Sequence, residues 1–144
     1  MTTNTETRTI TQEYELPHPP AKVWRALTEP ALVAQWLMAN DLVPEVGHAF
    51  TFRSEPAPWW DGIVRSEVLV CDPPKTLSYT WRSDMGEKLL DTVVTWTLAP
   101  TPAGTKLTLV HTGFKAGDAF AEGGAEKGWR AMLSTKLPEV LSRT

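Results

Sequence analysis

Residues 125–141, AEKGWRAMLSTKLPEVL, carry the pattern that decides the fold of this chain. Their apolar side chains recur at helical spacing, form one stripe and predict a single long helix. The members of that stripe are Trp129, Met132, Leu133, Leu137, Val140 and Leu141. Gly128 inside the helix costs about 1 kcal/mol relative to alanine, so we expect a close contact or a bend there. Pro138 should kink the helix near its end.

Residues 46–113 contain a series of short segments in which apolar and polar side chains alternate, as in strands with one buried face. Tyr79 and Trp81, for example, alternate with Ser78 and Thr80. The turns between the segments are short, which favours antiparallel hairpins because parallel connections need a dozen or more residues. We therefore predict an antiparallel sheet with one face covered.

The first part of the chain predicts one further strand and two short helices. Ile10, Tyr14 and Leu16 share one parity and indicate the strand. Pro20 suits the first turn of a helix, and Pro30 ends that helix and can start a second. The order of strand, two short helices, several strands and one long helix predicts an α+β domain, in which a curved antiparallel sheet wraps the last helix.

The composition argues against several classes of protein. The 144 residues carry a formal net charge of -3 and no dense lysine and arginine cluster, which argues against a nucleic-acid partner. No apolar run is long enough to span a membrane, and the first residues lack the apolar core of a signal peptide, so we expect a cytoplasmic protein without a membrane partner. The single cysteine, Cys71, is expected to be a buried, inert thiol. Because the three histidines show no ligand spacing, we expect no metal and no cofactor.

Several motifs occur in an order that resembles a known superfamily. They are Val23-Trp24-Arg25-Ala26-Leu27-Thr28-Glu29-Pro30 with Gln35-Trp36, Val46-Gly47 with Phe50, Gly62 through Asp72-Pro73-Pro74-Lys75-Thr76-Leu77-Ser78-Tyr79-Thr80-Trp81, Thr95-Trp96-Thr97-Leu98, Gly104-Thr105-Lys106-Leu107-Thr108-Leu109, His111-Thr112-Gly113-Phe114 and Gly128-Trp129. This order resembles the SRPBCC or START-like superfamily, and within it the branch homologous to the activator of the heat-shock chaperone ATPase, an AHSA-like domain. The resemblance covers residues 9–141 as a single domain and leaves residues 1–8 as a flexible N-terminal segment.

The resemblance implies a helix-grip fold. In such a fold a curved antiparallel β-sheet of six to seven strands surrounds a long C-terminal α-helix, with two short helices after the first strand. A cavity lies between the sheet and the long helix. Members of the superfamily bind lipids, sterols, polyketides and plant hormones, and some are aromatase/cyclases.

The seven tryptophans predict either a rigid aromatic core or a cavity walled by flat apolar rings. Trp24 and Trp36 are expected to anchor the two short helices. Ligand pockets are mostly apolar with a few placed polar groups, and Tyr79 and His111 would supply polar anchoring here. The residues that we expect to line a ligand site are Phe52, Trp60, Tyr79, Trp81, Trp96, His111, Phe114, Trp129, Met132 and Leu133.

His111 is the most informative polar residue, because its parity with Leu107 and Leu109 places it on the inward face. There it can hydrogen-bond a ligand, act as an acid or base, or be satisfied by a neighbouring tyrosine or backbone group. No second titratable partner accompanies it in the sequence pattern. We therefore assign no catalytic residue.

Two segments are candidates for covering a cavity. Trp59 and Trp60 are adjacent and would face opposite ways in an extended chain, so that one could cover the cavity while the other meets solvent or a partner. The segment 113–124, which includes Phe120, contains several glycines and precedes the predicted long helix. We expect it to be a flexible loop that could gate the cavity.

These observations leave three hypotheses open. The first is noncatalytic binding of a small hydrophobic or aromatic molecule in an internal cavity. The second is a polyketide cyclase-like or aromatase-like enzyme, which requires an inward acid–base pair. The third is a chaperone-linked protein-interaction domain with an exposed patch around Trp59, Trp60 or the two short helices, so a protein partner or a homodimer also stays open.

Overall fold

The computed structural model describes residues 8–84 and 89–144, in which seven strands form one sheet and a long helical segment crosses it. In chain order the elements are β1 (Arg8–Leu16), α1 (Pro20–Thr28), α2 (Pro30–Trp36), β2 (Ala39–Asn40), β3 (Ala49–Arg53), β4 (Ile63–Asp72), β5 (Thr76–Asp84), β6 (Leu89–Thr101), β7 (Gly104–Phe114), the 3-10 turn η1 (Ala116–Asp118), α3 (Ala119–Ala131), the π-turn η2 (Met132–Lys136) and α4 (Leu137–Arg143). The predicted flexible segment 1–8 lies outside the described residues, except for Arg8, which begins β1.

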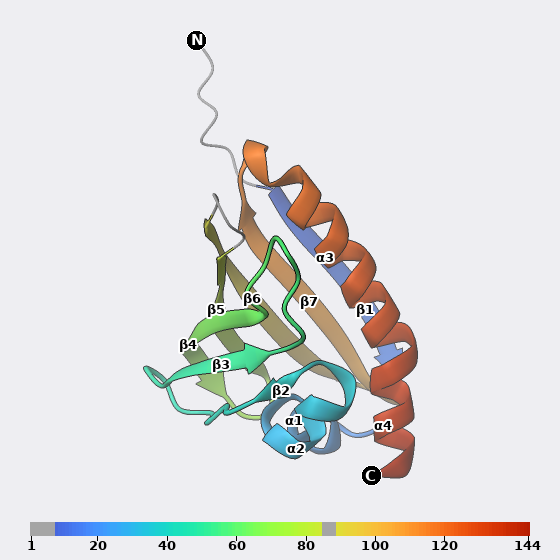
Figure 1. The fold of residues 1–144 in the computed structure, drawn as a ribbon. Coiled ribbons are helices and arrows are strands. Elements are labelled where there is room, and N and C mark those ends of the chain that lie inside the picture. The colour runs from blue at the N-terminus through green and yellow to red at the C-terminus, as the bar shows by residue number, and fades with distance from the viewer. Residues whose placement is uncertain (1–7, 85–88) are drawn as a thin grey trace.

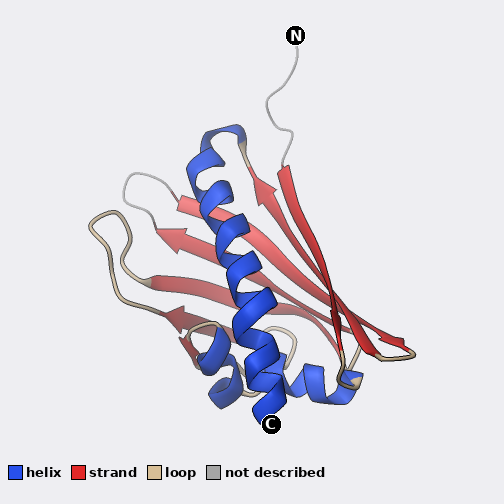
Figure 2. Cartoon of the chain, turned by 90° about the vertical axis from the view of Figure 1, so that its right-hand side faces the viewer, coloured by secondary structure: helices blue, strands red, loops and turns tan. Residues whose placement is uncertain are grey.

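The sheet is antiparallel throughout and has the strand order β1-β7-β6-β5-β4-β3-β2. Figure 1 shows the sheet curving beside the helical segment, with α1 and α2 near α4 at one end. In Figure 2 the segment from α3 to α4 runs across the face of the sheet. These features confirm the predicted helix-grip architecture, including the two short helices after the first strand. The two-residue strand β2 was not predicted, because two residues are too short to show an alternation.

Alternation of side chains places the core between the sheet and the helices. On β6, Val94, Trp96 and Leu98 are buried, as predicted from their shared parity. On β7, Leu107 and Leu109 are fully buried on the same inner face. Since successive residues of a strand point to opposite faces, the sheet presents one continuous apolar layer to the long helical segment.

The long helical segment begins earlier than the sequence predicted. The structure starts α3 at Ala119 instead of residue 125, so Gly123 and Gly124 lie inside the helix and the predicted flexible gate over 113–124 is wrong for most of its length. The 3-10 turn η1 leads into the helix and is capped by Asp118, whose Oδ2 accepts a hydrogen bond of 2.8 Å from the backbone N–H of Lys115. A carboxylate in this position also complements the helix dipole.

Near Pro138, where the sequence predicts a kink, the helix is interrupted by the π-turn η2 (Met132–Lys136). Proline lacks an N–H and its ring clashes with the carbonyl four residues earlier in a regular α-helix. The π-turn immediately before Pro138 widens the helix there, and the N–H of Leu137 donates to the carbonyl of Met132. At Gly128 no close approach explains the glycine, because a Cβ built there would lie 3.9 Å from Met132 Cε, an ordinary contact.

Candidate functional site

A cavity of about 320 Å³ lies between the inner face of the sheet and α3. It is lined by Met38, Trp59, Trp60, Val64, Trp81, Ser83, Leu90, His111, Phe120, Ala121, Gly124, Ala125, Gly128, Trp129 and Met132. Strands β4 to β7 supply one wall, α3 and η2 supply the opposite wall, and the loop between β3 and β4 supplies the two adjacent tryptophans. The lining is apolar apart from a few polar atoms, as is typical of sites for small molecules.

The cavity exists because the inward face of α3 carries very small side chains. Ala121 lies three and four residues before Gly124 and Ala125, and Gly128 lies four and three residues after them, so all four share one helix face and line the cavity. Farther along the same segment, Leu133, Leu137 and Leu141 are fully buried against the core. The helix therefore fills the space over the sheet at its C-terminal end and leaves it empty at its N-terminal end.

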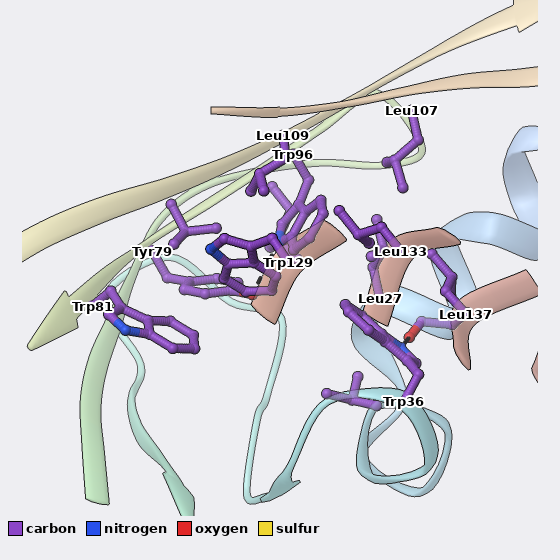
Figure 3. Packing of buried hydrophobic residues seen from close by; sticks show 14 of the residues in the cluster. Leu27, Trp36, Tyr79, Trp81, Trp96, Leu107, Leu109, Trp129, Leu133 and Leu137 are labelled. Atoms are coloured by element: carbon purple, nitrogen blue, oxygen red, sulfur yellow. Dashed lines mark hydrogen bonds between the residues drawn. The ribbon is translucent and has the colours of Figure 1, made fainter. Parts of the chain in front are cut away.

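Four tryptophans form a continuous series of ring contacts from the packed end of the molecule to the cavity. Trp36 meets Trp96 at a centroid distance of 5.8 Å, Trp96 meets Trp129 at 5.4 Å, and Trp129 meets Trp81 at 5.3 Å. Figure 3 shows Trp81 and Trp129 close together, with Trp36, Leu133 and Leu137 on the other side of the cluster. Trp36 is also fixed by its indole N–H, which donates to the Ala26 carbonyl at 2.8 Å.

The structure divides the predicted site residues into two groups. Five of them lie on the cavity wall, namely Trp60, Trp81, His111, Trp129 and Met132. The other five are buried in the packed core away from that wall, namely Phe52, Tyr79, Trp96, Phe114 and Leu133. The alternation of apolar and polar side chains identified the inward face of each strand. It does not show where along that face the cavity lies.

His111 is held between two neighbours and is fully buried. The indole N–H of Trp129 donates to His111 Nδ1 at 3.0 Å, so Nδ1 is the acceptor nitrogen. His111 Nε2 must then carry the proton and donate to Thr92 Oγ1 at 2.8 Å, while the Thr92 hydroxyl donates to the Trp81 carbonyl. Burial lowers the pKa of His111 to about 3. The imidazole is therefore neutral at physiological pH, and both of its nitrogens are occupied.

Tyr79 does not reach the cavity, and its hydroxyl accepts a hydrogen bond of 2.9 Å from the Trp96 indole N–H. Burial raises the pKa of Tyr79 well above its usual value.

Sequence reasoning missed Ser83, which lies on the cavity wall two residues after Trp81 on β5. The same alternation that identified Tyr79 and Trp81 as inward-facing includes Ser83, so the inward orientation of Ser83 could have been predicted from the sequence.

The mouth of the cavity is framed by aromatic rings. Trp59 and Trp60 stack at a centroid distance of 6.4 Å with an interplanar angle of 21°, and Trp59 meets Phe120 edge-on at 5.9 Å. The predicted opposite orientation of the two tryptophans is wrong, because the chain there forms a tight turn closed by two backbone hydrogen bonds between Ala57 and Trp60. Trp59 and Phe120 remain 49% and 77% exposed, so apolar surface continues from the cavity to the outside.

The structure also bears on residues that the sequence singled out but that lie outside the cavity. Cys71 is half-buried instead of buried, its thiol lies 3.2 Å from the Pro44 carbonyl oxygen, and burial raises its pKa. Trp24 is also only half-buried, in contrast to Trp36. Within residues 8–84 and 89–144, no group of three or more His, Cys, Asp or Glu side chains is arranged to hold a metal ion. None of the described helices has both the length and the apolar character needed to cross a membrane.

The curved antiparallel sheet, the long gripping helix and the apolar cavity between them define a helix-grip domain of the SRPBCC or START-like class. The chain belongs to the family described as "Activator of Hsp90 ATPase homolog 1-like protein", whose model matches residues 17–142. The resemblance inferred from the sequence motifs is thereby confirmed. None of the curated proteins matches this chain in sequence.

Solved structures similar to this chain come from several bacteria. Protein MLL2253 from Mesorhizobium loti is 45% identical, with a TM-score of 0.86 over 95% of this chain and 98% of that one. Protein BH1534 from Bacillus halodurans is 29% identical, with a TM-score of 0.76 over 93% of this chain and 96% of that one. CalU16 from Micromonospora echinospora shares the fold at 24% identity, with a TM-score of 0.70 over 94% of this chain and 76% of that one.

Proposed function

We propose that this chain is a noncatalytic binding protein that holds a small hydrophobic or aromatic molecule in the cavity beneath α3. The observation that carries the proposal is the empty space itself, which is bounded by the flat rings of Trp81 and Trp129 and by the small residues of α3. Because the pocket opens to solvent, its apolar wall is exposed to water, and a bound apolar molecule would remove that surface from water.

The size and chemistry of the cavity support a small apolar ligand. Its volume of about 320 Å³ lies at the lower end of the range of roughly 300–1,000 Å³ for small-molecule sites. At about 30 Å³ for each water molecule, this is room for about ten waters. Each 100 Å² of apolar ligand surface buried there would contribute about 2.5 kcal/mol in transfer free energy.

The enzyme hypothesis finds less support in the same site. General acid–base catalysis needs a titratable group that can exchange a proton with the substrate. Among the described residues that line the cavity, His111 is the one with a titratable side chain, and both of its nitrogens bond to protein groups. Its low pKa also makes the imidazole a weak base.

The chaperone-linked hypothesis would require an exposed interaction patch. Trp59 and Phe120 are exposed, but both belong to the rim of the cavity and contact each other. Their exposure is explained by a cavity that opens to solvent. A protein partner that docks on this rim would compete with the small molecule.

The proposal can be tested by titrating the protein with a flavone, naphthalene and a medium-chain fatty acid while recording tryptophan fluorescence. A pair of variants on α3 provides the control. Gly128→Leu places a side chain into the cavity, whereas Gly123→Leu places the same side chain on the exposed face, where a built Cβ has open space. Both changes gain helix propensity, by up to about 1 kcal/mol.

We expect at least one of these compounds to bind the wild-type protein and the Gly123→Leu variant with equal affinity. Gly128→Leu should weaken that binding at least tenfold, because the ligand and the leucine compete for the same space. Absence of a response to every compound would refute the proposal. Equal binding by the two glycine variants would place the ligand outside this cavity and would refute it as well.

A further inference from the structure

Ser83 carries a hydroxyl on the cavity wall that has no hydrogen-bond partner among the described residues. Its residue is 5% exposed, it lies on the cavity wall, and its neighbours across the sheet are Val64 on β4 and Leu90 on β6. No hydrogen bond joins its hydroxyl to another residue in the part of the chain that the structure describes. Its Oγ is accessible from the cavity, where a bound molecule could take the place of water as its hydrogen-bond partner.

Other polar groups on the wall are already engaged within the protein. The two nitrogens of His111 bond to Thr92 and Trp129, and the indole N–H of Trp60 donates to the Ile63 carbonyl at 3.3 Å. Besides Ser83, the indole N–H groups of Trp81 and Trp59 also make no hydrogen bond within the described residues. Trp59 stands on the exposed rim, whereas Ser83 and Trp81 lie two residues apart on the same face of β5, so the unused polar groups of the sheet wall lie on one strand.

The described part of the cavity wall also carries no charged side chain. Among its described lining residues there is no Asp, Glu, Lys or Arg side chain, and burial keeps His111 neutral. Burying a charged group without a partner is strongly unfavourable, whereas a neutral hydroxyl or carbonyl needs only one hydrogen-bond partner. A serine hydroxyl can serve either group, because it donates one hydrogen bond and accepts others.

We propose that Ser83 determines the specificity of the cavity, which takes a neutral aromatic molecule that bears a hydroxyl or carbonyl group bonded to the Ser83 hydroxyl. This inference rests on the proposed function, since it assumes that the cavity binds an apolar molecule. It adds two statements about specificity. The cavity excludes a carboxylate ligand, and a hydrogen bond to Ser83 on β5 makes an aromatic molecule with a hydroxyl or carbonyl group bind more tightly than an unsubstituted one.

Three probes of similar size separate these contributions: naphthalene, 2-naphthol and 2-naphthoate. Binding to the full chain is measured by NMR titration of the tryptophan indole N–H signals. In the wild type, 2-naphthol should bind about fivefold to tenfold more tightly than in Ser83→Ala, the range expected for one neutral hydrogen bond. Naphthalene should bind both proteins alike, and 2-naphthoate should bind most weakly.

Two further variants control for structural effects. Ser83→Thr retains the hydroxyl and should restore tight binding of 2-naphthol. Ser66→Ala removes a buried hydroxyl of β4, the strand next to β5, that has no partner among the described residues. Because Ser66 does not line the cavity, this variant should bind the three probes with the affinities of the wild type. Thermal unfolding of each variant would confirm that it is folded.

The outcomes distinguish this inference from the proposed function. If naphthalene binds and Ser83→Ala leaves the affinity for 2-naphthol unchanged, the role of Ser83 is wrong while the binding function stands. Tighter binding of 2-naphthoate than of 2-naphthol would equally overturn the inference. If neither naphthalene nor 2-naphthol binds, the proposed function fails and the inference fails with it.

Discussion

The two ends of the long helical segment face the same sheet, but they differ in how far side chains fill the space between the helix and the sheet. At the C-terminal end, η2 and α4 bury Leu133, Leu137 and Leu141 completely. At the N-terminal end, α3 presents Gly124 and Gly128 together with alanines, and a cavity of about 320 Å³ remains. The backbone architecture is continuous from one end to the other, so side-chain volume along one helix face is what separates the packed part from the hollow part.

The comparison explains how one small domain supports both stability and binding. The packed end buries Leu133, Leu137 and Leu141 completely, and the ring contacts from Trp36 through Trp96 to Trp129 connect it to the cavity. Binding residues at the hollow end can then remain under-packed without unfolding the domain. Substitutions at the packed end should therefore mainly reduce stability, and substitutions at the hollow end should mainly reduce binding.

The largest expected loss of stability from a single substitution is that of Leu137→Ala, with Met132→Ala as its comparison at the hollow end. Leu137 is fully buried at the packed end, and removing its side chain should cost about 3 kcal/mol, within the usual range for buried leucine. Met132 is half-buried and already borders empty space, so its loss should cost about 1 kcal/mol. Urea denaturation of the two variants measures both values. Equal losses would contradict a difference in packing between the two ends.

A second difference is expected on acidification, because His111 links the two ends through Trp129. An unfolded histidine takes up a proton below about pH 6.5, whereas the folded His111 stays neutral down to its pKa of about 3. The folded state therefore loses stability as the pH falls from about 6.5 toward about 3, by roughly 2–3 kcal/mol at pH 4.5.

This acid sensitivity can be isolated with His111→Gln. Glutamine can accept from Trp129 and donate to Thr92 without titrating, so the variant should lack the contribution of His111. The measurement is the free energy of unfolding at pH 7 and at about pH 4.5 for both proteins. An identical pH dependence in the wild type and the variant would show that His111 does not remain neutral when buried.

The smallest expected effect concerns buried hydroxyls of the sheet. Ser66 has a buried Oγ without a hydrogen-bond partner among the described residues, so Ser66→Ala should raise the free energy of unfolding by about 1 kcal/mol. Ser78 is equally buried but bonds to the Val94 carbonyl and to Thr95, so Ser78→Ala should lower it by about 1 kcal/mol. Thermal or urea unfolding distinguishes the two signs, and a loss of stability in both variants would contradict the assignment of Ser66.

Most of the fold could be predicted from the sequence, because alternation and helical spacing report directly on which side chains are buried. The start of α3 could not, since Gly123 and Gly124 are unfavourable in an isolated helix and the tertiary structure overrides that preference. The turn at Ala57–Trp60 was missed for a similar reason. Adjacent tryptophans face opposite ways only in extended chain, and that segment is not extended.

The candidate site could be predicted only in part. Parity placed Trp81 and His111 on the inner face of the sheet, helical spacing placed Trp129 on the facing helix, and the structure places all three on the cavity wall. Parity also placed Trp96 on the inner face, yet Trp96 is enclosed by packed neighbours. The position of the cavity depends on the small residues of α3, and their common face becomes visible only when the helix is known to begin before Gly124.

The most direct test of the central claim is a titration of the wild-type protein with naphthalene, followed through the indole N–H signals of the tryptophans. A ligand in the cavity should shift the signals of Trp60, Trp81 and Trp129 together, because all three line it, and should leave those of Trp24 and Trp36 unchanged. The shifts should disappear in Gly128→Leu and persist in Gly123→Leu. Shifts confined to Trp24 or Trp36, or no shifts at all, would contradict a binding cavity at this end of the helix.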